Sequence, residues 1–507
     1  MENAAEVIFI PGHGMGHLVP AVEMGKLLTS RAEWISVTFL IIGVPFGTGV
    51  DSYTQSLSQD AAGARRLRFL SLPPPPPQRR ENAAASSSAQ DINAFDHISA
   101  HKPAVRDVIS DFSGSGRVIA GVVVDMFSAD MIDVADEFGL PSYVFYTSGA
   151  GFLGLKFYAQ TLKDDHGRDI SDYRDSEAEL AVPSFSHPVP AKVLPTPMLD
   201  KYGLLLVQHC ARMIRRAKGI LINTFLELEA HAIASLSDGK FPSVYPVGPL
   251  INHPGGGGDD EEVKRWLDEQ PPSSVVFLCF GSYGSFSAEQ VKEIAAALQR
   301  GGWRFLWCLR RPKVKGEIGA PGDYSDPKEI LPETFLERTQ ARGKVIGWAA
   351  QMMVLSHPSI GGFVSHCGWN SILESVWCGV PVAAWPMYAE QQINAFELVV
   401  ELEMGVDIKM EYRSDTLKSP EEEEDDGNIQ SPVIVSADEI ECGIRKLMED
   451  GSNGDHGRII RKKMKDMKEK SRLALLEGGS SYNFLGHFIN DLAHQAKSSQ
   501  TSRIVKE

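Results

Sequence analysis

The 507-residue sequence has few cysteines and no long apolar segment. Its six cysteines are scattered without a CxxC pair, and most have apolar neighbours. We therefore expect reduced thiols rather than a disulfide framework. The longest apolar run, residues 37–44, is far too short to span a bilayer. The acidic N-terminus runs directly into a predicted strand, unlike a signal peptide. These features predict a cytoplasmic protein without stable membrane insertion.

Several motifs of known enzyme classes are also missing. No GxxxxGK[ST] segment occurs, which excludes a P-loop, and no GxSxG segment occurs. Cys367 has no clear activating partner, so acyl transfer has no support. His97 and His101 are four residues apart on a predicted helix, but no Glu or Cys motif accompanies them, and we expect no metal site. The net charge of −16 argues against a nucleic-acid partner.

The length and the order of predicted elements indicate two domains. A chain of 507 residues is too long for one ordinary core. Strands and helices alternate on both sides of a glycine-rich segment, residues 255–262, which is typical of two open parallel sheets facing a cleft. We predict an N-terminal domain at 1–250, a linker at 251–262 and a C-terminal domain at 263–480. Residues 481–507 are predicted to form a helix that packs back on the N-terminal domain and ends in a frayed tail.

Individual elements follow from apolar runs and breakers. Predicted strands are residues 7–10, 37–42, 118–124, 142–146, 219–222, 244–247, 275–280, 305–309, 345–346, 362–364 and 382–385. Predicted helices include residues 20–30, 130–138, 288–299 and 372–378. Residues 73–90, 313–327 and 416–430 have the composition of flexible insertions, and the tail is predicted to fray from Ser499.

A glycine-rich turn, GHGMGH at residues 12–17, follows the first predicted strand. A dinucleotide fingerprint needs glycine at position 17, where this sequence has His17. It also needs an acidic residue at the end of the second strand, where this sequence has Gly43, so a dinucleotide-binding site is not supported. A histidine at the mouth of a sheet can act as a general base, although a capping or packing role is equally open, and His13 lies in the same turn. Asp125 ends another predicted strand, where it could orient His17 or cap a helix.

The segment from 348 to 391 holds the densest set of signals. Between a short strand and a short helix lies the turn SHCGWNS at residues 365–371, whose backbone N–H groups and helix dipole would favour an anion such as phosphate. Glu374 fits either a capping box with Ser371 or a carboxylate that accepts two ribose hydroxyls. Trp348 is either a packed aromatic or a surface on which a base stacks.

Residues 348–391 closely resemble the plant secondary product glycosyltransferase box, the signature of plant UDP-sugar glycosyltransferases. The resemblance covers the full 44-residue box and agrees with the domain order. It implies the GT-B fold, with two facing Rossmann-like domains. The implied activity is inverting transfer of glucose from UDP-glucose to an acceptor hydroxyl, giving a β-O-glucoside, with no metal and no cofactor beyond the UDP-glucose co-substrate. A monomer is expected.

The resemblance also implies roles for individual residues. His17 would be the general base, and Asp125 would orient it. Along the donor from base to sugar, the implied contacts are Trp348, Ala349 and Gln351 at uracil, Glu374 at the ribose, His366, Ser371, Gly281 and Ser282 at the diphosphate, and Trp369, Asn370, Glu390, Gln391 and Thr147 at the sugar or the phosphate next to it.

Three positions of the box modify this expectation. Ala350 replaces the usual proline, and Glu390 replaces the frequent aspartate, whereas Gln391 matches the glucose-preferring form. Residues expected at the acceptor are mostly apolar, and ordinary core packing is the alternative for most of them: Met15, Phe127, Phe152, Leu153, Leu204 and Tyr388. They suit a flavonoid, another phenolic or a terpenoid, and residues 385–396 resemble the subgroup that acts on such compounds. A catalytically silent nucleotide-sugar-binding protein would keep the box but lose the base.

Overall fold

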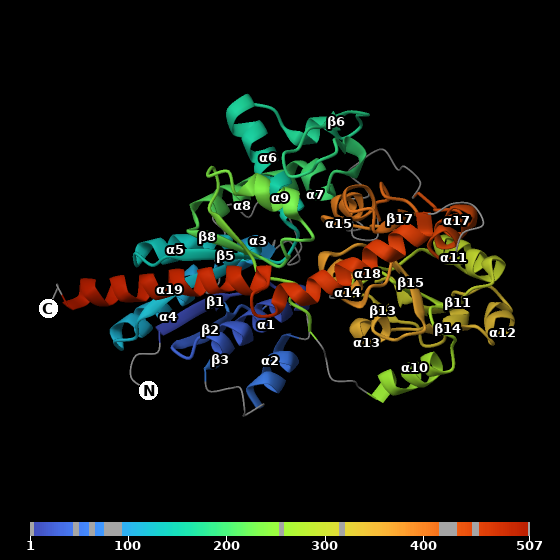
Figure 1. Cartoon of the computed structure of the whole chain (residues 1–507), viewed down its shortest axis with the longest axis horizontal. Coiled ribbons are helices and arrows are strands. Elements are labelled where there is room, and N and C mark those ends of the chain that lie inside the picture. Colours follow the sequence, from blue (N-terminus) through green and yellow to red (C-terminus); the bar gives the residue numbers. More distant parts are fainter. Residues whose placement is uncertain are drawn as a thin grey trace, which may run out of the picture.

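The computed structural model describes residues 5–43, 50–59, 66–75, 94–252, 258–313, 320–414, 433–448 and 456–504. These residues form two α/β domains, each built on one parallel sheet (Figure 1). We use "N-terminal domain" for the part around the seven-stranded sheet and "C-terminal domain" for the part around the six-stranded sheet. The fold class predicted from the sequence is confirmed.

The seven-stranded sheet has the order β3-β2-β1-β4-β5-β8-β9. Its strands are β1 (Ala5–Ile10), β2 (Ile35–Ile41), β3 (Leu67–Ser71), β4 (Ile119–Asp125), β5 (Ser142–Tyr146), β8 (Gly219–Ile222) and β9 (Ser243–Pro246). All neighbours pair in parallel. In β1, Val7 and Phe9 enter one buried cluster, and Ile8 and Ile10 enter another. Because both faces are buried, helices must cover both.

The helices of this domain alternate with its strands. They are α1 (Met15–Arg31), α2 (Val50–Gln59), α3 (Ala94–Ser99), α4 (Lys102–Gly114), η1 (Met126–Met131), α5 (Ile132–Glu137), α6 (Ala150–His166), η2 (Ile170–Tyr173), η3 (Ala191–Val193), α7 (Thr196–Leu199), α8 (Lys201–Arg216) and α9 (Ala230–Leu236). A small antiparallel pair, β6 (Glu179–Leu180) and β7 (Val189–Pro190), follows α6 and η2.

The six-stranded sheet has the order β14-β11-β10-β15-β16-β17 and is also parallel. Its strands are β10 (Val275–Cys279), β11 (Arg304–Cys308), β14 (Gly343–Ile346), β15 (Ile360–Ser365), β16 (Val382–Ala384) and β17 (Gly405–Asp407). The helical segments are α10 (Gly258–Asp268), α11 (Ala288–Gly301), η4 (Pro327–Glu329), α12 (Phe335–Thr339), α13 (Gln351–Leu355), α14 (Trp369–Cys378), α15 (Gln391–Phe396), the π-helical η5 (Glu397–Glu401), α17 (Ala437–Met448) and α18 (His456–Leu475).

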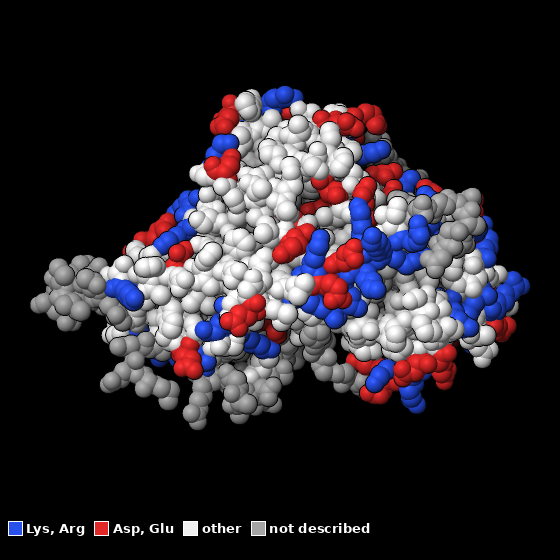
Figure 2. Space-filling model, in the orientation of Figure 1, with Lys and Arg blue, Asp and Glu red and all other residues white. Residues whose placement is uncertain are grey.

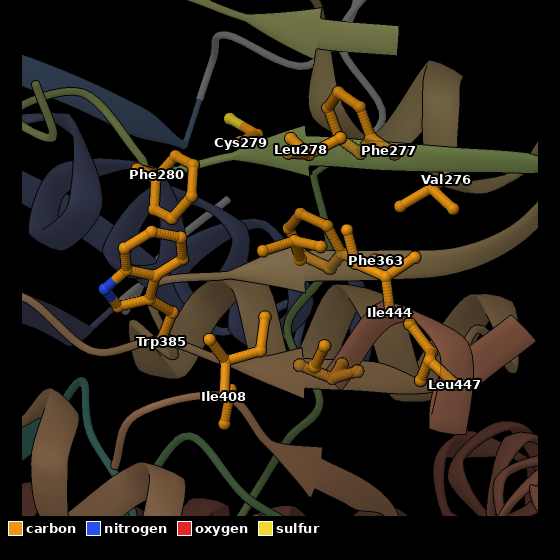
Figure 3. Packing of buried hydrophobic residues seen from close by; sticks show 14 of the residues in the cluster. Val276, Phe277, Leu278, Cys279, Phe280, Phe363, Trp385, Ile408, Ile444 and Leu447 are labelled. Carbon is orange, nitrogen blue, oxygen red and sulfur yellow. The ribbon is translucent and has the colours of Figure 1, made fainter. Parts of the chain in front are cut away.

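Aromatic packing fixes the carboxyl ends of strands in this second sheet. The ring of Phe280 meets that of Trp385 edge to face at 5.5 Å and that of Phe286 at 4.6 Å. Figure 3 shows Trp385 beside Phe280, with Ile408 and Phe363 continuing the same apolar layer. Because Phe280 directly precedes Gly281, this packing holds the turn after β10 in place.

The last helix returns to the first sheet. α19 (Ser480–Ile504) runs along the N-terminal domain after α18 has crossed the C-terminal domain (Figure 1). Phe488 packs edge to face on Tyr143 at 5.0 Å, and Asp491 accepts a hydrogen bond from the Tyr245 hydroxyl. The helix continues past Ser499, where a frayed tail was predicted. Figure 2 shows Lys and Arg side chains gathered along α18.

Some predicted element bounds were wrong. α1 begins at Met15 rather than at residue 20, so Pro20 lies inside the helix and not at its start. α14 begins at Trp369 rather than at 372, and residues 130–138 divide between η1 and α5. The predicted linker 251–262 lies partly outside the described residues, and from Gly258 onward it forms α10.

The predicted insertions at 73–90 and 416–430 lie mostly or wholly outside the described residues. The one at 313–327 is described from residue 320, where β13 (Gly322–Asp323) pairs antiparallel with β12 (Arg310–Arg311). All six cysteines are free, and four of them are buried. In the described part of the chain, no helix combines the length and apolar character needed to cross a membrane.

In both sheets the strand order reverses at one point. In the first sheet β1 lies between β2 and β4, and in the second β10 lies between β11 and β15. Ligands of open α/β sheets bind beyond the carboxyl ends of the strands at such a point. The residues that follow β1, β4, β10 and β15 are therefore the first place to look for a site.

Candidate active site between two parallel sheets

His17 lies in the first turn of α1, directly beyond the end of β1. Its Nδ1 lies 2.9 Å from Asp125 Oδ2 and 2.8 Å from Thr147 Oγ1. A carboxylate only accepts hydrogen bonds, so Nδ1 carries the proton and Nε2 keeps its lone pair. The His17 side chain is 19% exposed and that of Asp125 is 1% exposed. This arrangement suits a general base held by a buried carboxylate.

The electrostatics of His17 agree with this geometry. Burial lowers its pKa, but the charge and hydrogen bond of Asp125 raise it more, so that the pKa lies above its ordinary value. His13 lies in the adjacent turn and has a buried Nδ1 without a hydrogen-bond partner. Its pKa is lowered, chiefly by burial and then by His17. The sequence left open which of the two histidines could be the base. His17 is hydrogen-bonded to a carboxylate, whereas His13 Nδ1 is not hydrogen-bonded at all.

Asp125 divides its two carboxylate oxygens between two tasks. Oδ1 accepts a hydrogen bond from the Phe127 N–H at 2.9 Å and caps η1, and Oδ2 contacts His17. The Asp125 N–H donates to Ser128 Oγ, which in turn donates to the Ile10 carbonyl at the end of β1. Both roles considered for Asp125 are present, because capping fixes the carboxylate that holds His17.

Gly12 allows the close approach of this pair. A Cβ at Gly12 would lie 2.4 Å from Asp125 Oδ1 and 3.2 Å from His17 Cγ. Real atoms do not approach so closely, so any larger residue would displace the carboxylate or the imidazole. The glycine of the turn is required by the His17–Asp125 contact, which the motif alone did not indicate.

The second sheet forms a small cradle around His366. A Cβ would lie 2.5 Å from His366 Nε2 if placed on Gly281 and 2.7 Å if placed on Gly368. Burial lowers the pKa of His366 to about 4, so the ring is neutral at pH 7 and can donate one N–H. Its Nδ1 is buried without a hydrogen-bond partner. Ser282, next to Gly281, is exposed.

The turn before α14 is conformationally strained. Cys367 has φ 60°, an unusual value for a residue with a side chain, and its carbonyl accepts a hydrogen bond from Asn394 Nδ2 at 3.0 Å. Burial raises the pKa of its thiol, so the sulfur is not an activated nucleophile. Gly368, the N-cap of α14, lies against His366, so the positive end of this helix lies beside the His366 cradle.

Glu374 does not form the capping box that was one of its two predicted roles. Gly368 is the N-cap of α14, so Ser371 lies inside the helix. Gln351 Nε2 instead donates to Glu374 Oε2 at 2.6 Å and to Ser371 Oγ at 2.9 Å. Burial raises the pKa of Glu374 to about 7, and the Gln351 bond lowers it in part. A largely buried carboxylate remains that can accept further hydroxyl hydrogen bonds.

Trp348 is half exposed and lies at the edge of this group. The Arg310 guanidinium sits 5.3 Å from the centre of its ring. This is inconsistent with Trp348 being a core aromatic and leaves a flat surface for stacking. Ala349 is buried, and the Ala350 N–H donates to Asp260 Oδ1 at 3.3 Å.

The two halves of the site contact each other directly. Trp369 Nε1 donates to the Asn223 carbonyl at 2.8 Å, so its buried indole faces the N-terminal domain. Asn370 Nδ2 donates to the Gly16 carbonyl at 2.9 Å, next to His17. Pro20, four residues after Gly16, has no N–H to bond that carbonyl within α1, which leaves it available.

Two further predicted sugar contacts, Glu390 and Gln391, lie at the start of α15. Glu390 Oε1 lies 3.5 Å from Ser148 Oγ of the N-terminal domain, and its charge raises the pKa of His17. Gln391 Oε1 accepts hydrogen bonds from the N–H groups of Met387 and Tyr388 at 2.9 and 3.0 Å, so it fixes its own turn.

The predicted acceptor residues fall into two groups. Phe152, Leu153 and Leu204 are buried in the core of the N-terminal domain. Phe127 is partly buried, with its ring 4.7 Å from that of His17, and Met15 and Tyr388 are partly exposed. Phe127 is therefore the member of the set that directly adjoins the base.

Sequence reasoning missed two residues that shape the site, Ser128 and Asn223. Thr147 was expected at the sugar, and in the structure its hydroxyl also lies against His17. Its place directly after β5 was the available signal for this contact. His101 Nδ1 donates to the His97 carbonyl, and no group of three or more potential ligand side chains capable of holding a metal ion occurs among the residues described.

Known proteins resemble the chain along its whole length. The family model described as UDP-glucoronosyl and UDP-glucosyl transferase matches residues 256–416. The UDP-glucose flavonoid 3-O-glucosyltransferase 6 of Fragaria ananassa is 49% identical, with 97% of this chain and 99% of the relative covered. UDP-glycosyltransferase 1 of Panax ginseng is 48% identical over 96% of this chain and 99% of its own length.

Solved structures give the same result. A UGT transferase from Siraitia grosvenorii in complex with UDP has a TM-score of 0.81 and 42% identity, covering 96% of this chain and all of the other. A Medicago truncatula UGT complexed with UDP-glucose has a TM-score of 0.79 and 38% identity, covering 97% and 98% of the two chains. The chain therefore belongs to the UDP-glycosyltransferase family and has the GT-B fold.

Proposed function

We propose that this protein transfers glucose from UDP-glucose to a hydroxyl of a small lipophilic metabolite, a flavonoid, another phenolic or a terpenoid, with inversion to a β-O-glucoside. The observation that carries the proposal is the position of His17. Its Nδ1 is held by Asp125 and Thr147, and Asn370 at the start of α14 bonds to the carbonyl of the residue before it. This contact joins the turn that carries the proposed base to the start of α14, which carries the proposed diphosphate site.

In this mechanism His17 Nε2 removes the proton of the acceptor hydroxyl. The oxygen attacks the anomeric carbon as the bond to the diphosphate breaks, and UDP leaves with the electron pair. Asp125 stabilises the imidazolium that forms. The start of α14, the neutral His366 and Ser282 stabilise the charge on the leaving group. Trp348, Gln351 and Glu374 would hold the uridine.

The first test is a direct assay. The protein is incubated with UDP-glucose and a mixed aglycone library, and hexosylated products are sought by mass. We expect β-glucosides of hydroxylated aromatic or terpenoid compounds. A protein that binds UDP-glucose in calorimetry but glucosylates nothing would instead be a catalytically silent nucleotide-sugar-binding protein.

The second test is His17→Ala. Loss of a general base lowers the rate by about 10²–10⁴-fold. Because His17 lies outside the proposed UDP contacts, UDP-glucose affinity should stay within about twofold of the wild type. His13→Ala is the matched control, since His13 is the neighbouring histidine without a carboxylate, and most activity should remain. Near-normal turnover by His17→Ala would refute the role of base.

Three further statements belong to the same proposal. The protein acts as a monomer in the cytoplasm, with UDP-glucose as co-substrate and no other cofactor. The boundaries 1–250, 251–262 and 263–480 stay predictions, with α19 assigned to the N-terminal domain. Glucose is the preferred sugar, with Gln391 as the residue that supports this preference.

A further inference from the structure

Lys156 is a buried lysine that the proposed mechanism does not use. It lies in α6, two turns after its start, and is 5% exposed. Its Nζ lies 3.4 Å from Met126 Sδ and close to two rings, 4.7 Å from the centre of Phe152 and 5.2 Å from that of Tyr146. A thioether is a weak acceptor, and no carboxylate pairs with Lys156 within the described residues. Buried lysines without an anionic partner are rare.

The contacts of Lys156 come from the segments that build the active site. Met126 directly follows Asp125, and Tyr146 directly precedes Thr147, so both neighbours are fixed by the groups that hold His17. Phe152 is one of the residues expected at the acceptor. The charge of Lys156 also acts on the proposed base. Burial, Asp125 and Glu390 affect the pKa of His17 more strongly, and the Lys156 charge lowers it.

One of the two rings near Lys156 carries a second buried donor. The Tyr146 hydroxyl is buried and has no hydrogen-bond partner in the structure. The nearby Cys210 thiol is already engaged, since it donates to the Met126 carbonyl at 3.2 Å. The Lys156 ammonium, whose acceptor is a thioether, and the Tyr146 hydroxyl, which has no acceptor, thus both belong to side chains that lie against Phe152. A buried ammonium without an anionic partner and a buried hydroxyl without an acceptor would both be stabilised by a ligand that supplies an anionic oxygen.

We propose that Lys156 is a specificity residue of the acceptor site, which binds a carboxylate that the acceptor carries in addition to the hydroxyl that receives glucose. This inference rests on the proposed function and narrows its substrate class to hydroxylated acids with an apolar body. A carboxylate would give the ammonium a charged hydrogen bond in surroundings of low polarity, where such bonds are strong. The hydrogen bond to the Tyr146 hydroxyl would be its second contact.

The experiment compares acceptors that differ only in this charge. Hydroxycinnamic acids and their methyl esters are assayed with UDP-glucose, and each is also tested as a competitor of whichever library aglycone the wild type glucosylates. We expect kcat/KM, or the inhibition constant, to favour the acid. In Lys156→Met the preference for the acid should fall by about 10- to 100-fold, the range for losing one hydrogen bond to a charged group. The ester should change little, and the effect on the acid should appear mainly in KM.

Lys163→Met is the matched control. Lys163 lies on the same helix but is exposed and paired with Asp169, so its replacement should leave the ratio of acid to ester unchanged. Thermal unfolding and UDP-glucose calorimetry show whether Lys156→Met is folded with an intact donor site, and Lys156→Gln serves if it is not. Equal loss for acid and ester, no loss for either, or a wild type that prefers the ester or ignores both would overturn the inference. Absence of glucosyl transfer to any aglycone would refute the proposed function instead.

Discussion

Single side chains in this site owe their chemistry to what surrounds them rather than to their type. Three of its ionisable groups have pKa values displaced in different directions: His17 upward through Asp125, His366 downward through burial, and Glu374 upward through burial. Ionisable groups with displaced pKa values cluster at active sites. The pKa of Glu374 leads to a prediction about how UDP binding depends on pH.

Glu374 gives a prediction about donor binding. With its pKa raised to about 7, the side chain is largely protonated below that pH and accepts ribose hydroxyls poorly. The Kd for UDP should therefore fall as the pH rises from 6 to 8, with proton release on binding. Glu374→Gln should weaken binding about 10- to 100-fold at pH 8 and remove most of this dependence. Calorimetry in buffers of different ionisation enthalpy measures both quantities.

Glu390→Gln is the control for that measurement. Glu390 is expected at the sugar or the phosphate next to it and not at the ribose, so its replacement should leave the pH profile of UDP binding as in the wild type. A Glu374→Gln protein with the affinity and pH profile of the wild type would show that Glu374 does not hold the ribose.

At the scale of elements, strand order explains why the site residues meet. His17 follows β1 and Asp125 ends β4, whereas Gly281 and His366 follow β10 and β15. These are the two pairs of neighbouring strands at which the order reverses. The alternation of strands and helices in the sequence predicted parallel sheets, and residues after apolar strands were the right candidates. Pairing of particular strands was not readable from apolar runs, because such runs do not specify their neighbours.

The predictions that failed concern helix ends and side-chain partners. Pro20 suggested a helix start, yet α1 extends before it because the Gly16 carbonyl finds a partner in Asn370. Ser371 and Glu374 have the spacing of a capping box, yet Gly368 ends the turn and places both inside α14. In the first case a long-range contact overrides a local pattern, and the local pattern contains no information on that contact. In the second case the helix begins earlier than the spacing alone suggested.

Ala350, the N-cap of α13, allows a test at this scale. Its φ of −66° suits proline, the usual residue of the box, but its N–H bonds to Asp260. Proline should add about 0.4–1 kcal/mol through the unfolded chain, while loss of the hydrogen bond should cost about 0.5–1.5 kcal/mol. Ala350→Pro should thus change the free energy of unfolding little in the wild type and raise it in an Asp260→Ala background.

A double-mutant cycle by urea denaturation measures this coupling. Because the cycle cancels other effects of Asp260→Ala, it isolates the bond from the Ala350 N–H. Additive effects of the two substitutions would show that the hydrogen bond contributes nothing and that alanine has no compensation at this position.

At the scale of the whole molecule, two carboxyl groups of the π-helical η5 contact the N-terminal domain, and their pKa values are displaced in opposite directions. Glu401 accepts hydrogen bonds from Ser186 and from His187 of the N-terminal domain, which lower its pKa despite burial. Glu397 lies against Glu229, whose Oε1 accepts from the Gly151 N–H. Burial, then the charge of Glu229 and a hydrogen bond to it, raises the Glu397 pKa well above 4.5. The protonated form of Glu397 is therefore favoured in the folded protein.

Opposite shifts give opposite dependences of stability on pH. Because the Glu397 pKa is raised in the folded protein, its contribution to stability is fully present below pH 4.5. The contribution is lost as the pH rises toward the raised pKa, by at most about 1.4 kcal/mol per pH unit. Glu397→Gln retains a neutral hydrogen-bonding group. The variant should match the wild type near pH 5 and unfold at a higher temperature at pH 8.

Glu401→Gln is the control in the same turn with the opposite sign. The Glu401 carboxylate stabilises the folded protein above pH 4.5, and this contribution disappears as the pH falls through its lowered pKa. Glu401→Gln should therefore be less stable than the wild type at pH 7, with the difference shrinking toward pH 4. The titratable groups that face Glu397 are Glu229 and Glu401, and the one that faces Glu401 from the N-terminal domain is His187. If the difference in unfolding temperature between Glu397→Gln and the wild type is the same at pH 5 and pH 8, the folded protein does not favour the protonated form of Glu397.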